Sequence, residues 1–246
     1  MQLDLGNTRC KWRLVRGEKV LGRGSVDAGD AFLPPLEIQP EAILVASVAS
    51  AASEQQLALA TFERWEIEPW FARSEAETLG LRSSYAEPQR LGVDRWLAML
   101  AAWYPRRARV MVVDAGSALT VDIVAANGQH EGGYIMPGLA LMQRALVRDT
   151  QRVRFKQAVD GKLAPGHSTA EAVAHGAALA QCGAVRLALD TAMRAGGSAP
   201  CVIVSGGDGP ALVAQLGLDA EFYEDLVFDG LALVAGAAHT GAHQLE

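Results

Sequence analysis

The sequence predicts an α/β fold in which one module, a mixed β-sheet with flanking helices, occurs twice. Two observations point to the repeat. An acidic residue, a glycine and a hydroxyl residue occur together near the start of the chain, in Asp4–Thr8, and again in its middle, in Asp114–Ser117. An extended apolar stretch follows each copy, so each is expected to be the turn of a β-hairpin. Apolar β-branched runs also alternate with helical patterns in both halves, which is typical of a sheet with helices against it.

The first half is expected to contain one sheet and two helices. Glycine and aspartate are frequent in residues 22–29, so a loop with at most one short strand is expected there. Ser53 and Gln56 match a capping box, which predicts a helix start. The other elements expected are strands at 2–5, 11–15, 43–48 and 65–71, an irregular polar segment at 72–90, and a helix from Asp94 that ends at Pro105.

The second half restarts with a buried strand at 110–113 that runs into the second turn. We therefore expect two units, residues 1–107 and 108–246, and interpret the basic segment 106–109 as a solvated connection between them. The elements expected after the second turn are a strand at 119–124, a turn, short strand and turn at 132–138, helices at 139–147 and 169–194, a loop at 150–167, a strand at 201–205, a helix from Pro210 and a last helix at 231–243.

Composition limits the functional classes. Half of the 246 residues are hydrophobic and a fifth are charged, as in ordinary globular proteins. The formal net charge of −6 argues against a general nucleic-acid-binding surface. The three scattered cysteines predict reduced packing residues rather than a zinc site, and no signal peptide pattern begins the chain. The apolar stretch 170–193 contains charged residues and predicts a buried helix rather than a membrane span, so a cytoplasmic location is expected.

The two glycine turns suggest phosphate chemistry. Glycine lets the backbone approach a ligand closely, and backbone N–H groups in such a turn cradle phosphate oxygens. An adjacent aspartate is suited to hold a hydrated metal ion. A single copy would more often be an ordinary tight hairpin, but two copies, one opening each half, favour the phosphate interpretation.

The ordered set of motifs resembles a known family. The two hairpins resemble the phosphate motifs of the acetate kinase/sugar kinase/Hsp70/actin superfamily, and within it the chain is most similar to type III pantothenate kinase. The further segments that carry this resemblance are Leu91–Arg95, Gly132–Gly138, Ser168–Thr169 with Ala172 and Gly176, and Ser205–Asp208. The resemblance implies a duplicated actin-like, ribonuclease H-like ATPase fold. It also implies phosphorylation of pantothenate by ATP.

The resemblance implies that the first turn and its flanks contact ATP, with Mg²⁺ near Asp4 and Ser117 as a second phosphate contact. Lys11 is either a charge partner of the phosphates or a strand lysine that reaches solvent. Serine at 117 replaces the threonine more common in the family and keeps the hydroxyl. The ATP-binding residues so implied are Asp4, Leu5, Gly6, Asn7, Thr8, Arg9, Cys10, Lys11 and Ser117.

The quartet Gly92-Val93-Asp94-Arg95 resembles the family's pantothenate-binding motif, in which the aspartate is the general base. Arg95 would hold polar or carboxylate groups through its planar fork, and Tyr85 would close over the substrate. An aspartate in the first turn of a helix also has a structural explanation, because it complements the helix dipole.

Two residues of the second half complete the implied site. Asp114 resembles the ligand of a monovalent cation, K⁺ or NH₄⁺. Thr169 resembles a threonine that reaches the pantothenate site of the neighbouring subunit in a homodimer, although Ser168 and Glu171 also form a capping box that explains the segment structurally. Gly206 and Gly207 would let the backbone pass close to adenosine.

Two other functions stay open at this stage. One is a kinase of another small hydroxylated substrate, or a phosphatase, on the same fold. The other is a non-catalytic accessory protein connected with transcription, which the intact Asp4, Asp94 and Asp114 disfavour. The five histidines form no catalytic motif and are interpreted as structural or surface residues.

Overall fold

The computed structural model describes residues 1–6, 9–27, 33–34, 36, 38–150, 153 and 159–242, with side chains described as far as residue 237. The chain divides into two units: unit 1 comprises Met1–Tyr104 and Asp225–Glu246, and unit 2 comprises Pro105–Glu224. The first boundary lies close to the one expected at 107/108. The last helix, in contrast, belongs with unit 1 rather than with the second half of the chain.

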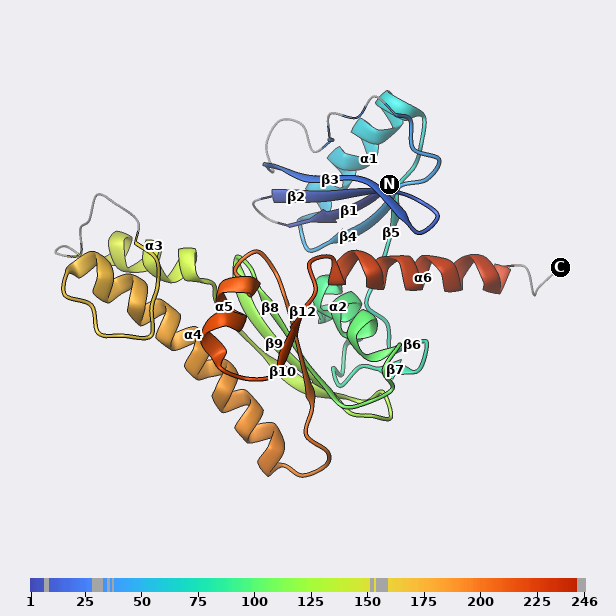
Figure 1. The fold of residues 1–246 in the computed structure, drawn as a ribbon. Coiled ribbons are helices and arrows are strands. Elements are labelled where there is room, and N and C mark those ends of the chain that lie inside the picture. Colours follow the sequence, from blue (N-terminus) through green and yellow to red (C-terminus); the bar gives the residue numbers. More distant parts are fainter. Residues whose placement is uncertain are drawn as a thin grey trace. The chain divides into compact units, whose positions relative to one another are not determined.

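Unit 1 contains a five-stranded mixed sheet in the order β3-β2-β1-β4-β5 (Figure 1). The central strand β1 pairs antiparallel with β2 and parallel with β4, so the sheet grows from it in both directions. The strands are β1 (Gln2–Leu5), β2 (Arg9–Arg16), β3 (Lys19–Asp27), β4 (Leu44–Ser47) and β5 (Trp70–Phe71).

Helices cover both faces of this sheet. On one face, α1 (Ala51–Trp65) buries Leu57 and Trp65 against alternate residues of the central strands. On the other face, α2 (Val93–Trp103) and α6 (Leu226–Ala242) pack against β4 and against each other. A Cβ atom at Gly230 of α6 would overlap the backbone of Leu97 in α2, so this glycine allows the two helices to cross closely. That contact explains why the last helix lies in unit 1.

A short hairpin and a single helical turn precede α2. They are β6 (Glu77–Thr78), β7 (Leu81–Arg82) and the 3₁₀ helix η1 (Pro88–Arg90).

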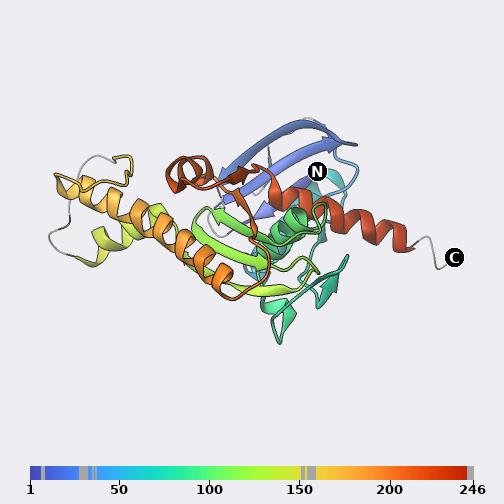
Figure 2. The same ribbon diagram turned by 60° about the horizontal axis from the view of Figure 1, so that its bottom comes forward.

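Unit 2 repeats the same sheet topology in the order β10-β9-β8-β11-β12. Its longest helix, α4, is the long orange helix in Figure 2. Here β8 takes the place of β1, pairing antiparallel with β9 and parallel with β11. The strands are β8 (Val110–Ala115), β9 (Ala118–Val124), β10 (His130–Pro137), β11 (Cys201–Ser205) and β12 (Ala220–Phe222), and the helices are α3 (Leu139–Asp149), α4 (Thr169–Arg194) and α5 (Gly209–Leu216). The predicted duplication of one α/β module is confirmed.

The expected loop with at most one short strand at 22–29 is wrong over 22–27, because β3 continues to Asp27. Residues 28 and 29 lie outside the described residues. The indole of Trp12 on β2 lies over Gly22 and Gly24 of β3, and a Cβ atom at Gly24 would lie 2.9 Å from its Nε1. The aromatic ring covers the glycines across the strand pair, which compensates for their low strand propensity.

Several boundaries also differ from expectation. The N-cap of α1 is Ser50, whose hydroxyl accepts the Ser53 N–H, so the expected capping box at Ser53 begins one turn too late. Trp65 ends α1 and does not start a strand. The turn and short strand expected at 132–138 are one continuous strand with a bulge after His130, and α6 begins at Leu226 rather than at 231.

The connection at 106–109 is not solvated at Arg109. This side chain is 5% exposed and pairs with Glu131 through two bonds of 2.9 and 2.6 Å. It also donates to the carbonyl oxygens of Ala192, Gly196 and Ser198, so it ties the C-terminal end of α4 to the edge of the sheet.

By length and composition alone α4 could cross a membrane, a test that the core helix of a soluble protein also passes. Half of its most apolar window is buried inside the chain. Val185 and Ala188 pack into the core beneath β8 and β9, so α4 is a covering helix of unit 2.

Candidate functional site

In unit 1 the first glycine turn is a tight hairpin, as predicted. The Gly6 N–H donates to the Arg9 carbonyl oxygen at 3.0 Å, and β1 pairs directly with β2. A side chain at Gly6 would press on the same carbonyl, at 3.2 Å. Asn7 and Thr8, two of the predicted ATP contacts, lie outside the described residues.

Asp4 and Lys11 are opposite each other across the hairpin. Directly opposed residues in antiparallel strands project on the same face, where opposite charges attract. The exposed amino group of Lys11 is therefore available to a ligand that also approaches Asp4. This placement fits both predicted roles of Lys11, as a charge partner of the phosphates and as a strand lysine that reaches solvent.

The neighbouring positions have different surroundings. Arg9 forms an exposed ion pair with Asp27 at 3.5 Å, which is a weak interaction. The Cys10 thiol and the Leu5 side chain are buried on the α1 side of the sheet. Burial, assisted by the charge of Asp4, raises the pKa of Cys10 to about 12, so its side chain stays a neutral thiol.

Asp4 lies on the face of the sheet that α2 covers. Its neighbour in register on β4 is Ala46, and Ala46 packs in one buried cluster with Val93 and Leu97 of α2. The residue after Val93 is Asp94. The first glycine turn and the start of α2 are therefore positioned by a shared core on one face of unit 1.

Gly92 leaves room for the carboxylate of Asp94. A Cβ atom at Gly92 would lie 2.6 Å from Asp94 Oδ1, so any side chain there would displace the acid. That oxygen also accepts the Arg95 backbone N–H at 2.7 Å, within the first turn of α2. The arrangement fits both the predicted base and the helix-dipole explanation.

The structure brings two of the predicted pantothenate contacts, Arg95 and Tyr85, together. The guanidinium donates from Nη1 to the Tyr85 hydroxyl at 3.1 Å and lies 5.9 Å from the centre of its ring. Arg95 is 6% exposed, so its orientation is fixed by packing. The chain before α2 is held by a buried bond of 2.8 Å from Ser74 Oγ to the Leu91 carbonyl oxygen.

In unit 2 the second glycine turn is surrounded by other glycines. The Gly138 N–H donates to the Ser117 carbonyl oxygen, from which a Cβ atom at 138 would be only 2.7 Å away. Gly206, with φ of +91°, lies against the Ala115 carbonyl oxygen and Asp114 Oδ1, leaving no space for a side chain. The exposed Ser117 thus stands at a turn walled by backbone, where positions 138 and 206 have no space for a side chain.

Oxygen atoms flank Asp114 on both neighbouring strands. Thr120 on β9 and Ser205 on β11 are its partners in register, and both carry hydroxyls. Carboxylate, hydroxyl and carbonyl oxygens are the donors that hard cations prefer. This donor set fits the monovalent cation expected at Asp114.

Two residues near this turn were not predicted. Gly138 and Asp208 each stand in a motif of the sequence, but neither was predicted to be a site residue. The Asp208 N–H donates to the Ala115 carbonyl oxygen, and burial raises the pKa of its carboxyl group. The sequence places Asp208 only after a glycine pair, and its proximity to Ala115 depends on how β11 pairs with β8.

Thr169 is the first residue of α4 and is exposed. Ser168 caps the helix by accepting the Glu171 N–H at 3.2 Å, as predicted, and Glu171 accepts the His167 N–H at 2.7 Å. The capping role is therefore real. It leaves the Thr169 side chain available for another role.

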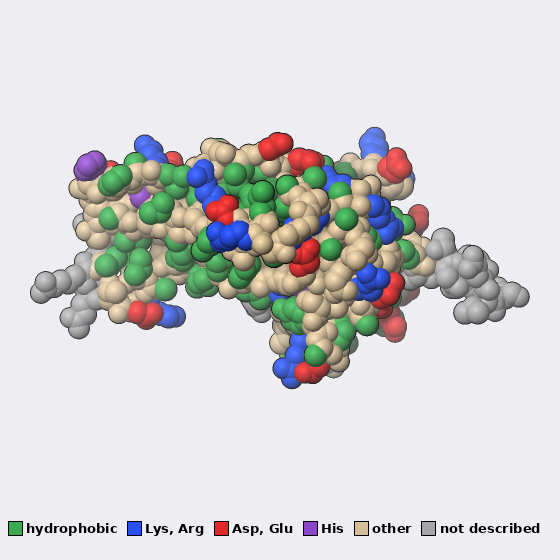
Figure 3. All heavy atoms as spheres, turned by 90° about the horizontal axis from the view of Figure 1, so that it is seen from below, with side chains coloured by type: hydrophobic (Ala, Val, Ile, Leu, Met, Phe, Trp, Pro, Cys, Tyr) green, Lys and Arg blue, Asp and Glu red, His purple; other side chains and the backbone are tan. Residues whose placement is uncertain are grey.

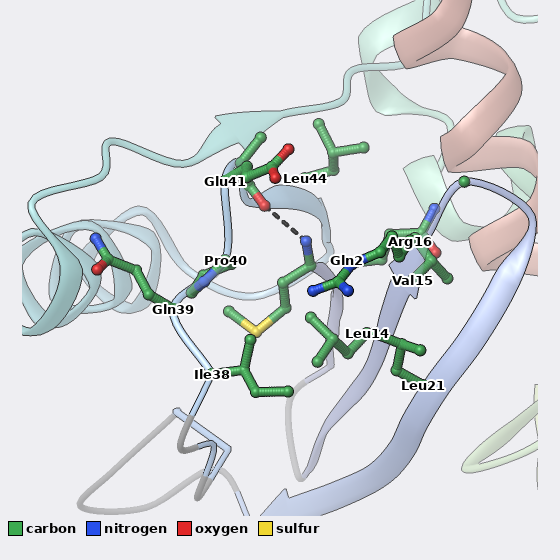
Figure 4. A pocket seen from close by; sticks show the side chains of 13 residues that line it. Gln2, Leu14, Val15, Arg16, Leu21, Ile38, Gln39, Pro40, Glu41 and Leu44 are labelled. Atoms are coloured by element: carbon green, nitrogen blue, oxygen red, sulfur yellow. Dashed lines mark hydrogen bonds between the residues drawn. The ribbon is translucent and has the colours of Figure 1, made fainter.

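A cavity of about 230 Å³ lies elsewhere in unit 1, near the start of β1 (Figure 4). Leu14, Leu21 and Ile38 contribute apolar walls, and the guanidinium of Arg16 points toward it. The first glycine turn follows the opposite, carboxyl end of β1. None of the predicted site residues lines this cavity.

Comparisons with known proteins cover most of the chain and point to one family. A model of the type III pantothenate kinase family matches residues 1–191. The type III pantothenate kinase of Marinobacter nauticus is 40% identical over 238 residues, covering 96% of this chain and 97% of the relative. That of Pseudomonas putida is 35% identical over 243 residues, covering 95% of this chain and 97% of the relative.

Solved structures show the same fold at lower sequence identity. A conserved protein of Campylobacter jejuni assigned to the Baf family of transcriptional activators is 21% identical with a TM-score of 0.60, covering 97% of this chain and 98% of its own. A Sinorhizobium meliloti protein assigned as a 2-dehydro-3-deoxygalactonokinase is 14% identical with a TM-score of 0.58, covering 96% and 98%. Since the family model and the curated relatives span most of the chain, this protein belongs to the type III pantothenate kinase family.

Proposed function

We propose that this protein transfers the γ-phosphoryl group of ATP to pantothenate, giving 4′-phosphopantothenate and ADP in the first step of coenzyme A synthesis. Membership of the family supports this proposal. The observation that carries it is the shared face of unit 1, where one core positions both Asp4 of the first hairpin and the start of α2 with Asp94. A cytoplasmic location accords with such a substrate.

In this proposal Asp94 is the general base. The primary hydroxyl oxygen of pantothenate attacks the γ-phosphorus, its proton passes to the Asp94 carboxylate, and the bond to the bridging oxygen of ADP breaks. Arg95 holds the pantothenate carboxylate through its fork, and the Tyr85 hydroxyl orients that guanidinium. Gly92 keeps the space in which Asp94 works.

The hairpin residues hold the nucleotide. The stretch Asp4–Lys11 contacts the phosphates, and Ser117 is the second phosphate contact. Asp4 supplies a carboxylate for Mg²⁺, which neutralises phosphate charge when bound. Asp114, with Thr120 and Ser205 beside it, holds K⁺ or NH₄⁺, because Lys11 alone adds little positive charge near the phosphates.

We also propose that the active form is a homodimer, with unit 2 supplying the interface. The α3 helix has no buried residue, and Leu141 and Leu146 on it are exposed. On α4 the alanines 174, 177 and 178 are used within the chain, whereas the opposite face exposes small and apolar residues, namely Ala172, Gly176, Leu179, Gly183 and Leu187. Figure 3 shows hydrophobic side chains spread over the left side, where these helices lie.

A second copy of this chain is the occupant that fits this surface. Gly176 and Gly183 have open space around them, so a second helix can approach the backbone closely. The exposed leucines on either side would then be buried. Thr169 at the start of the same helix would reach the partner's pantothenate site.

The direct test is formation of ADP from Mg-ATP on addition of pantothenate, for the wild type and for Asp94→Asn. We expect potassium- or ammonium-dependent activity that falls by about a thousandfold in the variant, with ATP binding retained. Asp219→Asn, an exposed change in the connection between α5 and β12, is the matched control and should keep full activity. If the wild type binds ATP but does not phosphorylate pantothenate, the fold assignment stands and the proposed substrate is wrong. A wild type that binds neither ligand would favour the accessory function.

A further inference from the structure

The segment 159–168, which we call the strap, lies along the first turns of α4 and runs in the opposite direction to the helix (Figure 1). Gly161 packs against the third turn, at Ala174 and Ala178. Further along, Ala164 is bonded to the second turn. Gly166 then packs against the first turn before the chain enters the helix.

The strap fits α4 without spare space. A Cβ atom at Gly161 would lie 2.8 Å from the Ala178 Cβ and 2.9 Å from the Ala174 carbonyl oxygen. At Gly166 it would lie 2.6 Å from the Glu171 carbonyl carbon. Backbone therefore packs directly on helix backbone at both ends of the strap.

Polar bonds hold the strap at three points. His175 Nδ1 donates to the Ala164 carbonyl oxygen at 2.8 Å, and the His175 side chain belongs to a residue only 9% exposed. Gln215 of α5 donates to the Gly161 carbonyl oxygen at 2.9 Å. The His167 N–H donates to Glu171 at 2.7 Å. The histidine bond is the middle one, and its donor residue is the most buried of the three.

We propose that His175 is a positioning residue for the pantothenate site, acting through the strap on Thr169. The strap leads through Gly166 and the capping residue Ser168 directly into Thr169. When the strap is fixed against the helix, the Thr169 side chain is held in one orientation toward its ligand. This inference rests on the proposed function, because it takes Thr169 as a substrate contact.

Loss of the bond would leave the Ala164 carbonyl oxygen without its donor in a partly buried place. Such a group is costly, so the strap would lift to reach water. The turn before Thr169 would then sample several conformations, and binding of pantothenate would have to select one of them. Nucleotide binding would be unaffected, since the ATP contacts lie on the two glycine hairpins.

The test compares His175→Ala, His175→Asn and His175→Gln. The amide nitrogen of asparagine is separated from Cα by the same number of bonds as Nδ1 of histidine, so it can replace Nδ1 as the donor. The amide nitrogen of glutamine is one bond further from Cα, in the position of Nε2. We therefore expect the KM for pantothenate to rise about tenfold in the alanine and glutamine variants and to stay near the wild-type value in His175→Asn, with the KM for ATP unchanged. Gln215→Ala, which frees the other end of the strap, should move the same constant in the same direction.

Thr191→Ala is the matched control, because it removes a side-chain-to-carbonyl bond of α4 far from the strap. Amide hydrogen exchange provides a readout independent of activity: residues 159–168 should exchange faster in His175→Ala and not in His175→Asn. Size-exclusion chromatography checks that the oligomeric state is the same in all variants.

The outcomes separate the two proposals. An active wild type with an unchanged pantothenate KM in His175→Ala overturns the inference alone, even if the strap exchanges faster. Unchanged exchange overturns it as well, because His175 then does not hold the strap. A wild type without pantothenate kinase activity overturns the proposed function and, with it, the role of Thr169.

Discussion

At the scale of single residues, Arg95 provides a sharp test of how the acceptor is held. Its buried guanidinium is oriented by Tyr85, and a lysine offers one point charge in place of a planar fork. Arg95→Lys should raise the KM for pantothenate at least about tenfold and leave the KM for ATP unchanged, as measured by steady-state kinetics. Arg90→Lys, an exposed residue paired with Glu87, is the control and should behave as the wild type. Equal effects of the two changes would contradict a specific role for the fork.

Cys10 gives a pH-dependent prediction. Its pKa is raised from 9.0 to about 12 in the folded protein, so the folded state retains the thiol proton that the unfolded state loses above pH 9. The contribution of the Cys10 thiol to the free energy of unfolding is therefore fully present below pH 9 and is lost as the pH rises toward 12. At pH 10 the loss is about 1.4 kcal/mol.

The measurement is urea unfolding at pH 7, 8.5 and 10 for the wild type and Cys10→Ala. The variant should be less stable at pH 7 because of the lost packing, but its free energy of unfolding should fall less with pH. Parallel pH profiles for the two proteins would show that the thiol does not titrate as expected.

The residue scale also shows what sequence can and cannot reveal about a site. Asp4, Asp94, Asp114 and Ser117 were named as candidates because each stands in a short motif whose neighbours are fixed by the chain itself. Gly138 and Asp208 were not, because each meets the second turn only through pairing of distant strands. The residues next to each position in the sequence do not indicate which distant backbone segment will contact it.

At the scale of elements, Gly206 at the end of β11 tests how tightly the second turn is built. Its φ of +91° and its contact with the Ala115 and Asp114 oxygens both exclude a side chain. Gly206→Ala should lower the free energy of unfolding by about 2 to 4 kcal/mol. Its neighbour Gly207 has open space around it, so Gly207→Ala should change stability by less than about 1 kcal/mol. Denaturant unfolding compares them, and similar losses in the two variants would contradict the close packing described here.

Elements were predicted well where the pattern is local and poorly where packing overrides it. The hairpins and α4 follow from turn residues and helical spacing. The strand β3 was missed because glycine weakens strand propensity, and only the Trp12 ring on the adjacent strand restores it. The assignment of α6 to unit 1 depends on the close fit of Gly230 against Leu97. The apolar pattern of α6 predicts a buried helix but does not predict which element it packs against.

At the scale of the whole molecule, the proposed homodimer predicts that two different inactive variants restore activity when their subunits are combined in one dimer. If Thr169 acts in the partner's site, a dimer of one Asp94→Asn subunit and one Thr169→Ala subunit contains one site with both residues intact and one with neither. Two such inactive proteins, mixed and allowed to exchange subunits, should regain activity. With random exchange, half of the dimers are mixed and each has one working site of two, so about a quarter of the wild-type rate is expected.

If Thr169 instead acts within its own subunit, every site in the mixture carries one defect and the activity stays at the level of the parents. The control is Leu179→Asp, which introduces a charge into the exposed face of α4 and should yield monomers by light scattering. Combined with either active-site change, it should abolish the recovery, because monomers cannot share sites. Recovery that persists in monomers would contradict the shared site, and a wild type that is monomeric from the outset would refute the dimer itself. The experiment thus decides whether the exposed face of α4 forms an interface that the reaction requires.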